Sequence, residues 1–314
     1  MVAQSPAHRE MNSQASGSPV IIVAGATGDL GRRICHYLLQ SGATVRALVR
    51  KETAQETIAS LQTAGIHMVQ VDFNNIPELA KACAGGTCLV SALSGLREVI
   101  VDVQNNLLQA AIAANIPRFI PSDYCIDFTK LPRGFNRNLD LRRDFCHIIE
   151  KAPIRATSIL NGMFTDLLTG QAPVVLSGLK RVVYWGNPQQ LLDFTTTDNT
   201  AAYTALAALD NNTPRFLRIA GEESSAEGLR DSATAATGKD FKLLRAGGLG
   251  GLQTMINITR KLFPKEKEVF PPWQGMQYLH NMFSGGPKLH PLDNHRYPGI
   301  RWTSVAEMLA TKPK

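Results

Sequence analysis

The chain has 314 residues, a hydrophobic share of 44%, a charged share of 19% and a formal net charge of +7. This length allows one α/β domain with an appended lobe, or two small domains, and the composition is that of an ordinary globular protein. The basic residues are dispersed and form no clustered stripe, and no run approaches the roughly 18 apolar residues of a membrane span. We therefore expect neither a nucleic-acid nor a membrane partner.

The five cysteines are odd in number and form no C-x-x-C pair. This pattern argues against a disulfide framework and against a metal site, and it suits a reducing, cytoplasmic compartment. Cys125 adjoins a possible active-site segment, but we expect it to be a packing residue. Residues 1–18 are polar and lack an apolar segment, so they are predicted to be a disordered tail rather than a signal peptide.

The first predicted element is a buried parallel strand over residues 20–24, which is an apolar run with β-branched residues. Three glycines follow it at intervals of three, and a helical pattern begins at once. Gly25 permits a tight turn, Gly28 lets the backbone approach a pyrophosphate, and Gly31 lets the helix pack close to the strand. A strand before and a helix after are the context that this dinucleotide-binding motif requires.

A second strand is predicted over residues 43–49, and Arg50 and Lys51 stand at its end. A chain that prefers NAD would carry an acidic residue here to hold the ribose 2′-hydroxyl. Two cations would instead attract a 2′-phosphate, and Arg50 can bind it through two hydrogen bonds. We therefore predict NADP(H) as the cofactor, with a solvated basic loop as the alternative interpretation.

Strands and helices continue to alternate beyond this point, which is typical of a doubly wound parallel sheet. Helices are predicted over 52–63, 77–84, 97–115 and 139–151, and strands over 67–71, 87–93, 117–120 and 154–160. The pattern then loosens, as expected for a smaller C-terminal lobe. Strands are predicted there over 182–185, 216–220 and 241–244, and helices over 198–209, 222–237, 247–263, 273–283 and from Ser304. Ser304 and Glu307 form a predicted capping box.

Several segments together resemble the NmrA-like, isoflavone-reductase-like branch of the atypical short-chain dehydrogenases/reductases. The resemblance is carried in chain order by Gly25-Ala26-Thr27-Gly28-Asp29-Leu30-Gly31, Arg50, Val90-Ser91-Ala92-Leu93, Gln104, Arg118-Phe119-Ile120-Pro121-Ser122-Asp123-Tyr124, Asn161-Gly162-Met163-Phe164, Leu292-Asp293-Asn294 and Tyr297-Pro298-Gly299. It implies a Rossmann-type NADP(H)-binding domain over 19–165, to which some later segments return, and a substrate lobe mainly over 166–314.

The resemblance also implies roles for particular residues around the cofactor. Arg50 and Lys51 would bind the 2′-phosphate, and Asp72 and Phe73 would lie against the adenine. The remaining cofactor contacts would come from Ser91, Ala92 and Leu93 under the middle of the cofactor, and from Pro121, Ser122 and Asn161 near the nicotinamide.

The chain departs from the family at the catalytic lysine, because that position falls on Arg142 and no lysine occurs between Lys130 and Lys151. An arginine stays charged and cannot act as a general base, although it can stabilise a developing oxyanion. We take Tyr124 as the best remaining proton donor, with Ser122 beside it, and a buried loop tyrosine as the alternative. Lys130 from the following loop is a further candidate. The arginines at 133, 137, 142 and 143 form a solvated face unless the substrate is acidic.

Two functions from different classes remain open. The first is an NADPH-dependent reductase of a small aromatic or polyketide-like carbonyl, imine or conjugated alkene, with hydride leaving the nicotinamide C4. The second is an NAD(P)-sensing regulator that binds a protein partner, and a cofactor-assisted isomerase or cyclase is a third possibility. A small-molecule substrate is expected for the enzyme, and a homodimer is compatible with either function.

Overall fold

The computed structural model describes residues 17–170 and 172–311, so residues 1–16 of the predicted tail lie outside the described part. Its centre is a parallel sheet of six strands in the order β3-β2-β1-β4-β5-β6. The strands are β1 (Val20–Ala24), β2 (Thr44–Arg50), β3 (His67–Val71), β4 (Cys88–Ser91), β5 (Arg118–Ile120) and β6 (Arg155–Ala156). This order turns back at β1, so the carboxyl ends of β1 and β4 form the crevice where ligands of such sheets bind.

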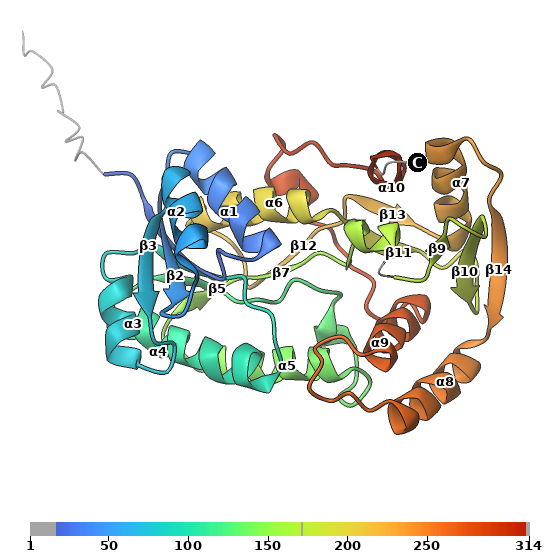
Figure 1. Ribbon diagram of the computed structural model, residues 1–314, viewed down its shortest axis with the longest axis horizontal. Helices are drawn as coiled ribbons and strands as arrows, with labels where there is room; N and C mark the ends of the chain where they lie inside the picture. The colour runs from blue at the N-terminus through green and yellow to red at the C-terminus, as the bar shows by residue number, and fades with distance from the viewer. Residues whose placement is uncertain (1–16, 171, 312–314) are drawn as a thin grey trace, which may run out of the picture.

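Helices cover both faces of the sheet, as Figure 1 shows. On one face Ile21 and Val23 pack against α1 (Asp29–Gln40) and α6 (Thr197–Leu209). On the other face Ile22 and Ala24 pack against a second group of helices. That group comprises α3 (Ile76–Cys83), α4 (Gln104–Ala113) and α5 (Arg137–Ile149), while α2 (Gln55–Thr63) precedes β3. The strict alternation of β1 side chains between two apolar layers is what a buried parallel strand requires.

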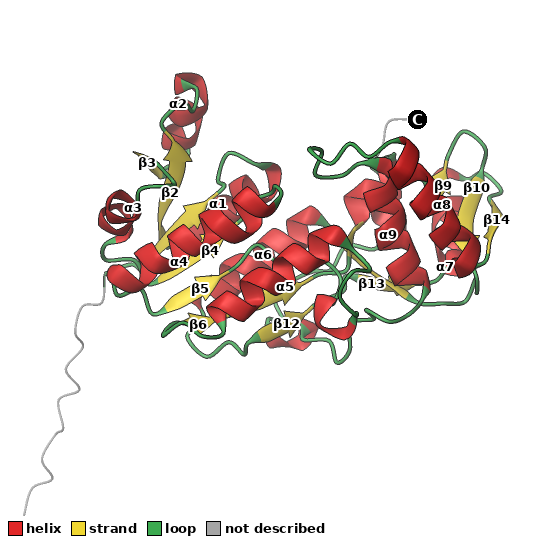
Figure 2. Cartoon of the chain, turned by 90° about the horizontal axis from the view of Figure 1, so that it is seen from below, coloured by secondary structure: helices red, strands yellow, loops and turns green. Residues whose placement is uncertain are grey.

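The C-terminal lobe is built from short strands and four helices, on the right of Figure 1. Three small sheets have the orders β14-β10-β9, β13-β11-β8 and β12-β7. Their strands are β7 (Ser158–Leu160), β8 (Met163–Phe164), β9 (Val175–Leu176), β10 (Arg181–Trp185), β11 (Leu192–Thr195), β12 (Phe216–Arg218), β13 (Glu222–Ser224) and β14 (Lys242–Gly247). The sheet β12-β7 joins the lobe to the first domain, since Ile159 and Leu217 pack in the layer with α1 and α6; Figure 2 shows β12 close to β5 and β6. The helices are α7 (Ala226–Thr237), α8 (Leu249–Leu262), α9 (Pro272–Phe283) and α10 (Val305–Ala310).

Three predicted elements were wrong in detail. The strand predicted over 154–160 is two strands, because the chain leaves β5 after β6 and pairs from Ser158 onward with β12. The helix predicted over 222–237 begins only after the strand β13, with Ser225 as its N-cap. The helix predicted over 97–115 starts as a π-helical segment, Glu98–Val103, before α4. Strands β8, β9 and β11 were not predicted, because they are too short to show a period.

Later parts of the chain complete the first domain. Helix α6 packs on α1, and Arg118 of β5 donates hydrogen bonds to the carbonyl oxygens of Ala207 and Ala208 at the end of α6 (2.7 and 2.9 Å). An arginine that satisfies the last carbonyls of a helix fixes that helix end. Ser304 caps α10 with the predicted capping box. No helix within residues 17–170 and 172–311 is long and apolar enough to cross a membrane.

Candidate functional site

The glycine turn joins β1 to α1 and depends on two positions where a side chain cannot fit. Gly25 has φ +92°, and a Cβ there would lie 2.6 Å from the Ala92 carbonyl oxygen. A Cβ on Gly31 would lie 2.1 Å from the carbonyl oxygen of Gly25. Both distances are impossible for real atoms, so these two glycines are fixed by the turn itself and by the close approach of α1 to β1.

Gly28 is different, because nothing in the folded chain requires it to be a glycine. A Cβ there would meet only the Gly25 carbonyl oxygen, at an ordinary 3.5 Å, and the residue is exposed at the N-cap of α1. No side chain caps this helix, so N–H groups of its first turn stay available for an anion. A pyrophosphate bound at Gly28 and the first turn of α1 stays a prediction, and the space around Gly28 is compatible with it.

A cavity of about 360 Å³ lies beside this turn. It is lined by Gly25, Thr27, Leu48, Val49, Arg50, Glu52, Thr53, Phe73 and Leu93. Among the described residues the Arg50 side chain has no hydrogen-bond or ion-pair partner, whereas the Lys51 ammonium binds the Glu78 carboxylate at 3.0 Å. Arg50 is therefore a cation without a partner in the described chain, whereas Lys51 is paired with Glu78 of α3.

Two further residues differ from the expectation for this end of the site. Phe73 lines the cavity, but the exposed Asp72 accepts a hydrogen bond from the Asn74 backbone N–H (2.9 Å) and shapes the turn after β3. Glu52 lines the cavity two residues after Arg50 and was not singled out from the sequence. Its carboxylate opposes binding of a phosphate, so Arg50 must outweigh it for NADP(H) to be preferred.

The carboxyl ends of β4 and β5 lie next to the turn and are tied together by side chains. The Ser122 hydroxyl donates to the Leu93 carbonyl oxygen (2.6 Å), and the Ser122 N–H donates to Oε1 of buried Gln104 (2.8 Å). Ala92 N–H bonds to the carbonyl oxygen of Ala24 at the end of β1 (2.8 Å). Ser122 is thus fixed at this edge by the family residue Gln104.

Several buried polar atoms near these strand ends have no partner among the described residues, and Ser91 Oγ and Asn161 Oδ1 are two of them. Asn161 is held by its N–H, which donates to the Cys125 carbonyl oxygen (3.0 Å), and its Nδ2 reaches Thr200 Oγ1 at 3.4 Å. Buried polar atoms are normally satisfied, so an unpaired pair at a ligand edge is a sign of a ligand with polar groups. Both residues were predicted to touch the cofactor.

Tyr124, the predicted proton donor, is buried in an apolar layer. Its ring lies in the apolar layer between the sheet and α6, with Ala201 and Ala205, and only 6% of the residue is exposed. Its hydroxyl is buried, and burial raises its pKa well above the ordinary value. This burial matches the buried loop tyrosine of the alternative interpretation and not the predicted proton donor.

Arg142 lies near the same edge, on α5. It interacts electrostatically with Cys125 and Asp123, which follow Ser122 in the chain, and with Tyr278 of α9. Its guanidinium Nη1 donates to the Asn138 carbonyl oxygen (3.1 Å), and its Nε is buried without a partner in the described chain. The structure thus places Arg142 between the end of β5 and the C-terminal lobe.

Tyr278 is the site residue that the sequence did not reveal. It lies on the predicted helix 273–283, but a helical period says only which residues share a face, not which distant helix that face meets. Burial raises the pKa of Tyr278 to about 12, and Arg142 opposes that rise. Lys130, the other candidate, is instead bonded to the carbonyl oxygen of Lys288 (2.6 Å).

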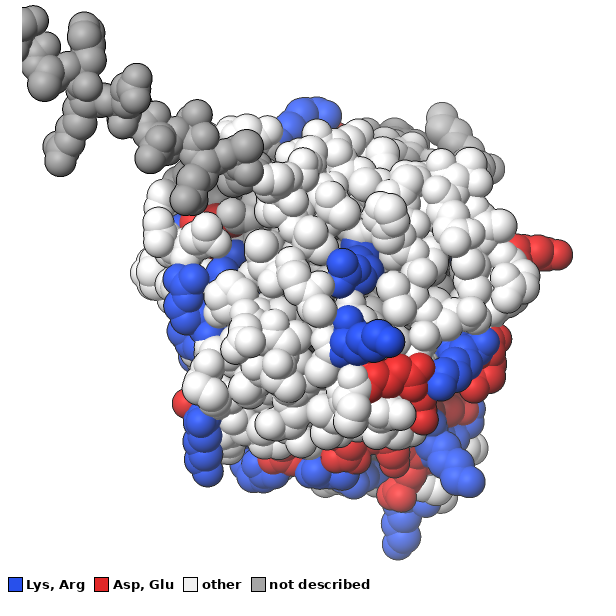
Figure 3. All heavy atoms as spheres, turned by 90° about the vertical axis from the view of Figure 1, so that its left-hand side faces the viewer, with Lys and Arg blue, Asp and Glu red and all other residues white. Residues whose placement is uncertain are grey.

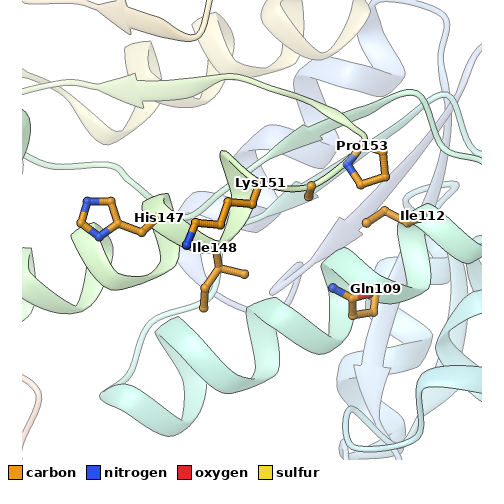
Figure 4. A pocket seen from close by; sticks show the side chains of 7 residues that line it. Gln109, Ile112, His147, Ile148, Lys151 and Pro153 are labelled. Atoms are coloured by element: carbon orange, nitrogen blue, oxygen red, sulfur yellow. The ribbon is translucent and has the colours of Figure 1, made fainter.

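A second hollow, of about 530 Å³, lies between α4 and α5 (Figure 4). It is lined by Gln109, Ile112, His147, Ile148, Lys151, Ala152 and Pro153. These residues come from the C-terminal ends of the two helices, and such helices run antiparallel to the strands. The hollow therefore lies toward the amino edge of the sheet, away from the glycine turn, and none of its residues belongs to the predicted site.

Charged side chains on the outer end of the molecule form no single basic face. In Figure 3 the lysines and arginines are scattered among uncharged residues and alternate with acidic ones. Among the described residues no group of three or more His, Cys, Asp and Glu side chains is placed to hold a metal ion. The positive charge that bears on the candidate site is therefore local, and it is carried by Arg50 and Arg142.

This arrangement, with a glycine turn at the crevice of a doubly wound sheet, defines a dinucleotide-binding protein of the Rossmann type. The sequence model of the NmrA-like family matches residues 18–243, and the chain belongs to that family. The predicted family and the predicted fold class are both confirmed.

Individual relatives agree with this assignment. Pinoresinol reductase 2 of Arabidopsis thaliana is 28% identical over 208 residues, which cover 62% of this chain and 65%, just under two thirds, of that protein. A structure titled AtPrR2 with NADP+ and (+)pinoresinol superposes with a TM-score of 0.79 at 22% identity, over 94% of this chain and 99% of the other. A crystal structure of isoflavone reductase gives a TM-score of 0.78 at 19% identity, over 93% and 98%. These proteins are named as reductases, in agreement with the predicted class of NADP-dependent oxidoreductase.

Proposed function

We propose that this chain is an NADPH-dependent reductase of a small aromatic or polyketide-like substrate with a carbonyl, imine or conjugated alkene as the hydride acceptor. The observation that carries the proposal is the cavity beside the glycine turn, which is lined by Gly25 and Thr27 of that turn and by Arg50, a cation without a partner among the described residues. The named reductases among its relatives support the same class of activity.

The residues present fit such a cofactor. The first turn of α1 would hold its pyrophosphate, Arg50 its 2′-phosphate, and Phe73 its adenine, while Ser91 and Asn161 would supply polar contacts from the strand ends. When bound, the cofactor supplies a hydride to the acceptor. We also propose that the Ser122 hydroxyl lies near the hydride acceptor. To polarise that acceptor, the hydroxyl would have to give up its hydrogen bond to the Leu93 carbonyl oxygen.

Arg142 cannot perform the proton transfer of the family lysine. Its guanidinium remains charged throughout the physiological range, so it neither takes up nor releases a proton during turnover. It can hold negative charge on the substrate, which is electrostatic stabilisation rather than general base catalysis. We therefore propose Arg142 as the charge-holding residue of the reaction.

The test is loss of NADPH absorbance with a panel of aromatic ketones, aldehydes, imines and conjugated alkenes, with NADH in parallel. We expect at least one acceptor to be reduced with NADPH in preference to NADH, and Ser122→Ala and Arg142→Gln to lower kcat. Gly28→Val, which blocks the cofactor, is the inactive control. Turnover that survives all three substitutions would refute the site.

A regulator that binds NADP(H) without turnover is the second candidate, and the replacement of the family lysine by Arg142 favours it. A regulator would bind NADPH tightly in titrations but would oxidise it with no acceptor in the panel. These two results together would refute the reductase and support a regulator that senses NADP(H).

A further inference from the structure

Four arginines lie at positions 133 to 143, and three of them form ion pairs or several hydrogen bonds. Arg133 pairs with Asp144, and Arg143 pairs with Asp140 at 3.0 Å. Arg137 donates to the carbonyl oxygens of residues 266, 268 and 269. Arg142 is the exception, because its single hydrogen bond goes to the carbonyl oxygen of Asn138. The predicted solvated face therefore contains one arginine of a different kind.

Arg142 is partly buried and has no ion-pair partner among the described residues. Its Nε atom is buried and unpaired, and no carboxylate among the described residues lies within 4.0 Å of its nitrogens. A guanidinium has five N–H donors in a planar fork, and burying them without partners costs free energy. Proteins normally resolve such a cost by pairing the charge, so this site is incomplete in the chain alone.

The groups around Arg142 do not supply that pairing. Burial raises the pKa of both the Cys125 thiol and the Tyr278 hydroxyl to about 12, so both are neutral at physiological pH. The carboxyl of Asp123 lies more than 4.0 Å from the Arg142 nitrogens and accepts a hydrogen bond from Ser158 Oγ (2.6 Å). Burial raises the pKa of this carboxyl, while Arg142 and Arg215 oppose that rise. Tyr278 has no hydrogen-bond partner in the described chain, so its O–H remains available as a donor beside the guanidinium.

The junction between α5 and α9 holds the two donors in place. Asn136, the N-cap of α5, accepts a hydrogen bond from Gln274 Nε2 (2.6 Å) and donates one to Asn281 Oδ1 (3.1 Å). Gln274 and Asn281 lie four residues before and three after Tyr278, which places all three on one face of α9. Donors fixed before a ligand arrives lose little entropy when it binds.

The surroundings also indicate the body of the ligand. The apolar cluster of the C-terminal lobe includes Cys125, Ile126, Phe128 and Leu139, and Met276 and Tyr278 pack against it while partly buried. Cys125 and Tyr278 also interact electrostatically with Arg142, so a group bound there would have an apolar cluster and an aromatic ring close by. A small aromatic acid offers both parts, an oxyanion for the guanidinium and a ring for these side chains.

We propose that Arg142 and Tyr278 form a binding site for an anionic oxygen group of the substrate, a carboxylate attached to an aromatic body. The proposal rests on the proposed function, because it assigns the substrate class of that same site. The proposed substrate is therefore acidic, and its charge would pair the Arg142 guanidinium once bound.

The test is calorimetric titration of the protein saturated with NADP+, which occupies the phosphate-binding positions at the glycine turn. The probes are benzoate and cinnamate, each compared with its neutral amide. We expect each carboxylate to bind at least about tenfold more tightly than its amide, and Arg142→Gln to abolish that preference. Arg142→Lys should keep part of it, and Tyr278→Phe should weaken carboxylate binding about threefold to tenfold.

Arg133→Gln is the matched control, since it removes the same charge from an exposed arginine of the same segment and should leave the preference unchanged. Equal binding of carboxylate and amide to the unaltered protein would overturn the proposal, and so would a preference that survives in Arg142→Gln. If Arg142→Gln does not fold, the comparison of carboxylate and amide binding in the unaltered protein and in Arg142→Lys still tests the proposal. Because this readout is binding, it separates the proposal from reductase activity: carboxylate binding that depends on Arg142, without turnover of any acceptor, would refute only the reductase.

Discussion

The glycine turn and the α5–α9 junction both offer hydrogen-bond donors to an anionic ligand, but the donors are of different kinds. The turn uses backbone: two glycines that the fold requires and one that it leaves open. The junction uses side chains, Arg142 and Tyr278, from helices that are far apart in the sequence. We propose that the turn binds a phosphate group, which is common to many ligands, whereas the junction contains Arg142, where the sequence predicts a departure from the family lysine. The local backbone thus determines the cofactor site that many proteins share, and side chains from distant helices determine the features particular to this chain.

The largest effect that separates fold from binding is expected at Gly31. Gly31→Ala would force a Cβ against the carbonyl oxygen of Gly25, and α1 must move away from the sheet. We expect the free energy of unfolding to fall by about 3 kcal/mol, measured by denaturant titration. Gly178→Ala, where a Cβ meets open space, is the control and should cost less than about 0.5 kcal/mol. Equal losses would contradict the assigned role of Gly31.

Gly28→Val should have the opposite profile. The backbone of Gly28 is extended, with φ −79° and ψ 166°, so valine is accommodated and stability should change by less than about 1 kcal/mol. The side chain would occupy the space for the pyrophosphate, and the Kd for NADP(H) and NAD(H) should rise at least about 100-fold. Fluorescence titration of both cofactors checks this prediction, and ordinary affinity in the variant would exclude the turn as the phosphate site.

At the junction, the comparable change is Asn136→Ala. It removes a helix cap and two buried hydrogen bonds between α5 and α9, so unfolding should become easier by about 2 kcal/mol. Asn75→Ala removes only the exposed cap of α3 and should cost about 1 kcal/mol. NADP(H) affinity should be unchanged in both variants. A fall in cofactor affinity on loss of Asn136 would show that the two regions are not separate.

The smallest effects are expected at the edge of the cofactor cavity. Arg50→Ala should weaken NADPH about tenfold and leave NADH unchanged, because Arg50 is the unpaired cation. Lys51→Ala should weaken NADPH less than about threefold, because the Lys51 ammonium is held by Glu78. Titration measures both affinities for NADPH, and equal losses in the two variants would contradict the different roles assigned to Arg50 and Lys51.

The sequence predicted the turn, the sheet and Arg50 because each depends on residues close together in the chain. It identified Arg142 as unusual, but only the fold shows that this arginine lacks an ion pair while its neighbours Arg133 and Arg143 have one. It misplaced Tyr124, because a residue just after a strand faces either side of the sheet according to how the chain turns there. It gave no indication of Tyr278, whose position depends on how α9 docks on α5.

The packing of α6 on α1 has a consequence for how the protein is made. Residues 197–209 cover the apolar face of the sheet beside β1, and the ring of Tyr297 packs against Tyr203 of α6 (4.8 Å between centroids). While a ribosome is still adding the C-terminal lobe, the cofactor-binding half therefore exposes the layer that includes Ile34 and Leu38 to solvent. This layer is covered only once residues 197–209 have emerged, so the cofactor-binding half depends on a segment that follows it in the chain.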